Sequence, residues 1–109
     1  MRALAAACAT LFLTGCVQTI AQGRVERALT DNGVGANTAA CMAERMVDRL
    51  TIDQLKKLEN LKPREGEAKR PTGVRDFLRR VNRVGDAEVV AVTGSSAALC
   101  AAGVANEAR

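Results

Sequence analysis

Between Asn37 and Leu61, apolar side chains recur at helical spacing in two consecutive runs. Asn37 or Thr38 can cap the first run, and Thr51 and Gln54 stand at capping-box spacing before the second. This pattern predicts two helices joined with almost no loop. The first stripe, at i, i+3, i+4, i+7, i+8 and i+11, consists of Ala39, Met42, Ala43, Met46, Val47 and Leu50. In the second run, the residues predicted to face the core are Ile52, Leu55, Leu58 and Leu61.

The segments on either side of this pair also read as helices. Positions 17–22 are expected to be a short tether, and the helix after it should end near Gly33. Residues 62–71 contain two prolines and no apolar periodicity, which predicts a mobile, solvated loop. From Thr72 or Gly73 to Gly85, one apolar face with an arginine-rich face beside it predicts a further helix.

The final segment is open to two interpretations. Asp86 is a suitable helix cap, and the alanine-rich run up to Ala102 favours one helix over about residues 87–102. The run Val89 to Val92 could instead begin as a strand, although no second strand is available to pair with it. We favour the helix and expect it to be the central buried element. The predicted fold is therefore all-α, a bundle of four or five short helices.

The residue types that are missing restrict the possible chemistry. The chain has no His, Trp or Tyr, and its two phenylalanines are Phe12 and Phe77. Without histidine, no Ser-His or Cys-His nucleophile pair can be built. Without aromatic platforms, bases cannot stack as they do in many single-strand nucleic-acid binders. We expect no enzymatic activity, no cofactor and no metal site.

The N-terminus resembles an export signal. Arg2 supplies a positive start, and residues 3–13 are apolar except for Thr10. About a dozen apolar residues fall short of the roughly 20 that a helix needs to cross a bilayer. Length and flanking residues fit the apolar region of a secretory signal peptide.

The apolar segment runs directly into Leu13-Thr14-Gly15-Cys16, which resembles the lipobox of bacterial lipoprotein precursors. The resemblance implies that residues 1–15 are a signal peptide cut after Gly15 and that Cys16 becomes acylated. Residues 16–22 would then be the lipidated cysteine and its tether, and residues 23–109 the helical domain. Val17, where inner-membrane lipoproteins often have Asp, favours the outer membrane, with the domain facing the periplasm. Export also argues against nucleic acid as partner, despite the helix-turn-helix spacing of residues 37–61.

Processing at Cys16 would leave two other cysteines, Cys41 and Cys100, because Cys8 lies in the signal peptide. An even pair in an exported chain predicts a disulfide, which would staple the bundle. The alternative is two free buried cysteines that behave as small apolar residues.

Charge is least balanced between Lys56 and Arg83, where ten basic residues face four acidic ones. Such a run usually forms a solvated face. It could also bind an anionic partner, and the candidate residues are Lys56, Lys57, Arg75, Arg79, Arg80 and Arg83. Two hypotheses follow. The first is a non-enzymatic envelope lipoprotein with a structural or protein-interaction role, anchored to the membrane through its lipid. The second is an electrostatic binder of phospholipid, lipopolysaccharide or peptidoglycan.

Overall fold

The computed structural model describes residues 2–103 as helices and short connections, with side chains from Cys16 onward except Val17. No strand occurs among these residues, so the prediction of an all-α fold is confirmed. Positions 104–109, the end of the predicted domain, lie outside the described residues. The described helices are α1 (Arg2–Asp31), α2 (Ala36–Arg49), α3 (Ile52–Glu59), α4 (Val74–Val81) and α5 (Ala87–Ala101).

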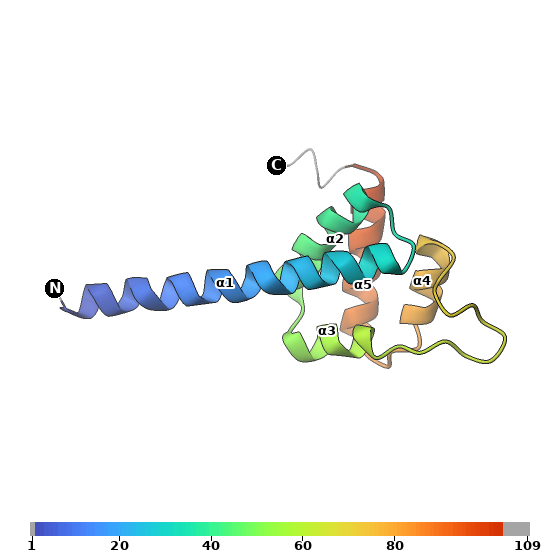
Figure 1. The fold of residues 1–109 in the computed structure, drawn as a ribbon, viewed down its shortest axis with the longest axis horizontal. Helices are drawn as coiled ribbons and strands as arrows, with labels where there is room; N and C mark the ends of the chain where they lie inside the picture. Colours follow the sequence, from blue (N-terminus) through green and yellow to red (C-terminus); the bar gives the residue numbers. More distant parts are fainter. Residues whose placement is uncertain (1, 104–109) are drawn as a thin grey trace.

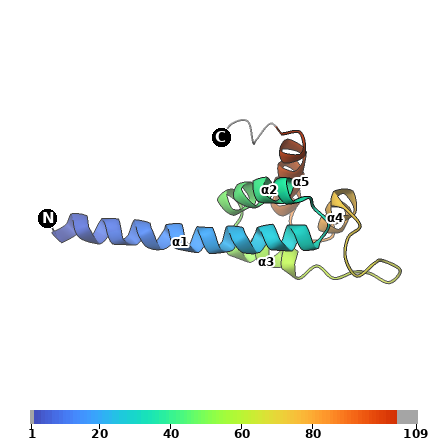
Figure 2. The same cartoon turned by 45° about the horizontal axis from the view of Figure 1, so that its top comes forward.

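Helix α2 is the centre of the bundle, because it packs against α1 on one side and α5 on the other. Figure 1 shows α4 beside α5, and Figure 2 shows α3 lying along the lower side of α1. The N-terminal half of α1 projects away from the other helices, which gives the molecule its length of 62 Å against a width of 30 Å. None of the helices within the described residues is both long and apolar enough to span a bilayer.

The pair α2 and α3 follows the predicted pattern closely. Five members of the first stripe are buried, and the remaining one, Val47, is half-buried. The capping box is present, with the Thr51 hydroxyl accepting from the Gln54 amide and the Gln54 side chain accepting from the Thr51 amide. Two details were wrong. Ile52 is 48% exposed; it is the first residue of α3, and the helix that α3 mainly contacts is α1.

The second wrong detail concerns the start of α2. This helix begins one residue before Asn37, and Gly35 occupies the N-cap position without a side-chain hydrogen bond. Neither Asn37 nor Thr38 therefore caps the helix. The preceding turn is set by Gly33, whose φ of +88° is a left-handed conformation that glycine adopts without strain.

Helix α5 forms as predicted, with the Asp86 carboxylate accepting from the amides of Glu88 and Val89. It is not the central element, however. Val89, Thr93 and Ala97 are buried against the neighbouring helices, whereas Ala91 and Ala98 are exposed. The sequence does not distinguish the buried face of α5 from its exposed face, because alanine occurs on both and has the same hydropathy in either place.

The expected tether at 17–22 is helical, because α1 is continuous from Arg2 to Asp31. Ile20 in this segment is 66% exposed, and among the described side chains the core begins at Leu29. The 62–71 segment is irregular, as predicted. Its end is fixed, since Pro71 is buried and approaches Gly33 at the turn between α1 and α2.

Candidate functional site

Cys16 lies in the projecting part of α1, where its side chain is exposed and free. Leu29, where the described core begins, stands 13 positions after Cys16, which corresponds to about 20 Å along a helix axis. The thiol is therefore well outside the bundle. Leu13, Thr14 and Gly15 belong to the same helix, although their side chains lie outside the described set.

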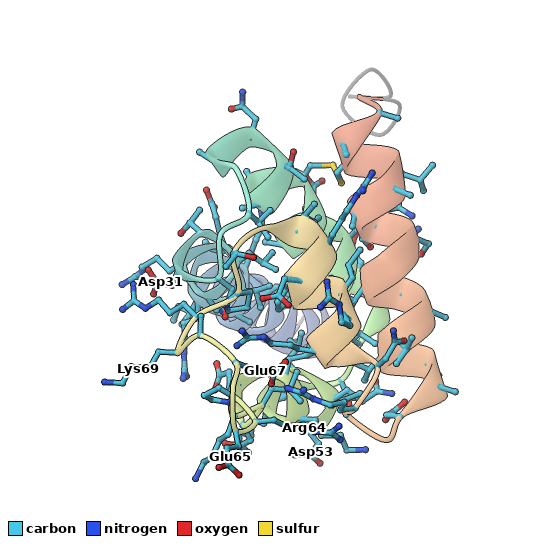
Figure 3. The ribbon with its side chains drawn as sticks, turned by 90° about the vertical axis from the view of Figure 1, so that its right-hand side faces the viewer. Asp31, Asp53, Arg64, Glu65, Glu67 and Lys69 are labelled. Carbon is cyan, nitrogen blue, oxygen red and sulfur yellow. A yellow bond between two sulfur atoms is a disulfide. The ribbon has the colours of Figure 1, made fainter. Side chains whose placement is uncertain are left out.

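Cys41 and Cys100 form a disulfide, with their Cα atoms 5.7 Å apart. Both residues are buried, and Figure 3 shows the bond joining α2 to α5 near the end of α5. The prediction of this pair is confirmed, and Cys16 is the free cysteine among the residues whose side chains are described. Closing a loop of this length stabilises the fold by about 4 kcal/mol in the chain-entropy model.

The six candidate cations do not form one exposed face. Arg80 is the clearest exception, because only 7% of its side chain is exposed. Its guanidinium donates to Asp76 at 3.1 Å and lies 3.7 Å from the Glu67 carboxylate. Arg83 is half-buried and donates to Glu67 at 2.8 Å. Both arginines are therefore used inside the fold rather than offered to an anionic partner.

The Glu67 carboxylate contacts both of these arginines. It also accepts from the backbone amide of Arg64 at 2.7 Å, which closes a turn within the loop. Figure 3 shows Glu67 directed toward the bundle while its neighbour Glu65 extends away. The Arg64 amide, followed by the Arg83 side chain, lowers the pKa of Glu67 below its usual value. The loop is thereby tied to α4 at its middle.

Lys57 is also engaged, since its ammonium lies 2.9 Å from the Asp86 carboxylate at the start of α5. This contact, together with the cap amide of Val89, lowers the pKa of Asp86. The remaining candidates are Lys56, Arg75 and Arg79, all exposed. Of these, Arg79 has only a long 3.8 Å contact with Asp76.

Sequence reasoning missed an open cavity of about 450 Å³, which is lined by residues of α1, α2, α3, α4 and the 62–71 loop. Asp31 and Lys69, both at its edge, are labelled in Figure 3. The one feature of the sequence that points to the cavity is a set of apolar side chains that the neighbouring helices do not fully bury. Val25, Leu58 and Leu61 belong to helical stripes but remain half-buried, because α1 and α3 touch at few points.

Within the part of the chain that the structure describes, no three Cys, Asp or Glu side chains gather as they would around a metal ion. The geometry instead offers an exposed thiol on a projecting helix, a small stapled bundle and an apolar cavity with charged edges. No family model, curated protein or solved structure matches this chain. Its function must therefore be argued from its own residues.

Proposed function

We propose that this chain is a bacterial lipoprotein precursor whose mature form is a non-enzymatic, membrane-anchored envelope protein. The observation that carries the proposal is Leu13-Thr14-Gly15-Cys16 at the end of a short apolar segment. Its role would be structural or in protein interaction.

The placement of Cys16 supports this proposal. A processing enzyme needs access to the peptide bond after Gly15 and to the thiol, and Cys16 is exposed outside the bundle. Cleavage there would remove no residue of the described core, which begins at Leu29 with Val25 packed against it. The signal segment and the folded domain are thus separable in structural terms.

The cysteine usage supports export as well. Cys41 and Cys100 are paired in a buried disulfide, the form that persists in an oxidising compartment such as the periplasm. One acyl chain gives only marginal membrane binding, so the three expected on a mature lipoprotein cysteine would hold the domain firmly on the bilayer. Val17 after the cysteine favours the outer membrane.

Metabolic labelling with a long-chain fatty acid in a bacterial host tests the acylation directly. Wild-type protein should incorporate the label, and Cys16→Ser should abolish it. Cys8→Ser is the matched control, because Cys8 lies in the segment that processing removes, so this variant should label like wild type. Equal labelling of Cys16→Ser and wild type would contradict the proposal.

Electrostatic contact with anionic envelope material is the second candidate. Its support is the exposure of four of the six cations considered from the sequence; Lys57 is paired with Asp86, and the other three are Lys56, Arg75 and Arg79. Because exposed charges are screened within about 10 Å at 0.1 M salt, binding to anionic vesicles should collapse between low and moderate salt. Vesicle sedimentation at two salt concentrations checks this, and salt-insensitive binding to a single protein would favour the first role.

A further inference from the structure

The cavity between α1 and α3 is large enough to hold a small molecule. Its volume of about 450 Å³ falls within the range of roughly 300–1,000 Å³ that is typical of ligand pockets. Few contacts join α1 to α3, and Val25, Leu58 and Leu61 line the cavity between them as half-buried side chains. No described helix covers this opening; the 62–71 loop borders it.

The interior of the cavity is mainly apolar. Leu29, Met46, Leu55 and Phe77 line it, and all four are core residues. Arg80 also lines it, but Asp76 and Glu67 balance its charge. A hydrocarbon chain would find apolar contacts here, whereas water needs several polar partners to occupy a cavity stably.

The rim of the cavity is cationic. It carries four exposed basic residues against two carboxylates, Asp31 and Glu59. Arg24 lies 3.5 Å from Glu59, so that pair is neutral overall. The basic rim residues are Arg24, Arg27, Lys62 and Lys69.

We propose that this cavity binds a single-chain anionic amphiphile. The hydrocarbon tail would occupy the apolar interior, and a carboxylate or phosphate head would lie at the rim near Lys62 and Lys69. The apolar floor and the surplus of rim cations match the two ends of such a molecule. The site is separate from Cys16, so it does not depend on acylation of that residue.

The test uses the full chain with Cys16→Ser, so that no attached lipid can compete for the cavity. Equilibrium dialysis would measure binding of palmitate, lysophosphatidylglycerol and lysophosphatidylcholine, each below its micelle concentration. We expect saturable binding of one anionic molecule per chain. The zwitterionic lysophosphatidylcholine should bind roughly tenfold more weakly, because it brings no net charge to the rim. Binding of palmitate alone would identify the head as a carboxylate, and binding of lysophosphatidylglycerol alone would identify it as a phosphate diester.

Two charge-reversed pairs separate the cavity from general electrostatics. Lys62→Glu with Lys69→Glu alters the rim, and Lys56→Glu with Arg75→Glu makes the same charge change at exposed residues outside the cavity. The rim pair should weaken anion binding by roughly tenfold or more, and the outer pair should leave it nearly unchanged. Circular dichroism would verify that both pairs remain helical.

Ala28→Phe tests the tail site, because Ala28 lines the cavity and a larger side chain there would project into the space for the tail. This variant should lose binding of both anionic probes. The proposal is overturned if neither probe binds saturably, if lysophosphatidylcholine binds as tightly as they do, or if both charge-reversed pairs weaken binding equally. None of these results bears on acylation of Cys16, which the labelling experiment decides.

Discussion

Glu67 joins the 62–71 loop to α4, and this contact could not be anticipated from the sequence. The segment lacks periodicity, so no pattern says which of its charges turns inward. Glu67 stands 13 positions before Arg80, too far for any helical spacing rule. The Asp76–Arg80 pair, by contrast, has the i,i+4 spacing at which helical side chains of opposite charge meet, and it is present at 3.1 Å. Local pairs are predictable, whereas the burial of Arg80 depended on a tertiary partner.

Replacing Glu67 with Gln should destabilise the domain in a pH-dependent manner. Because the folded-state pKa of Glu67 is lowered, its charged form contributes stability above its unfolded pKa, near 4.5, and that contribution is lost as pH falls through the lower folded value. Urea unfolding followed by circular dichroism should therefore show a deficit for Glu67→Gln at about pH 7 that shrinks toward about pH 3.

Glu65→Gln is the matched control for that substitution. Glu65 belongs to the same loop but extends away from the bundle in Figure 3. Its replacement should leave the unfolding midpoint unchanged at both pH values. A deficit of equal size for Glu65→Gln and Glu67→Gln would mean that net charge, rather than the contacts of Glu67, sets the effect.

Among the secondary-structure elements, α2 and α3 were the most predictable, because each carries a strong apolar stripe and the capping box marks their junction. The start of α2 was misplaced because Gly35 has no side chain to reveal it as a cap. The exposed side of α5 was missed because small residues have no amphipathic pattern. The cavity was missed since periodicity shows which face is apolar but not how far apart two faces lie.

The capping box at the start of α3 should contribute measurably to the stability of the domain. Thr51→Ala removes the acceptor for the Gln54 amide and should cost about 1 kcal/mol of unfolding free energy. Thr72→Ala is the control, because only the backbone amide of Thr72 takes part in a described hydrogen bond. Urea unfolding should show a loss for Thr51→Ala alone, and equal midpoints for the two variants would contradict a capping role.

At the scale of the whole molecule, the disulfide fixes α5 against the central helix α2. The pairing was predictable from the number of cysteines and the export signal together. Replacing both Cys41 and Cys100 with Ala should lower the unfolding free energy by about 4 kcal/mol, a large share of the roughly 5–15 kcal/mol typical of a domain. Unfolding without reductant measures the loss. Cys16→Ser is the control and should unfold like wild type. A double variant as stable as wild type would show that the disulfide does not contribute to the free energy of unfolding.

We propose that residues 1–15 are a signal peptide and that Cys16 is the lipid anchor of the mature protein. The most direct measurement is the intact mass of the protein recovered, without reduction, from the membrane fraction of a bacterial host. We expect a chain that begins at Cys16, heavier by its acyl groups and lighter by the two hydrogens lost in the Cys41–Cys100 bond. An unacylated chain that still begins at Met1, with free thiols, would contradict it.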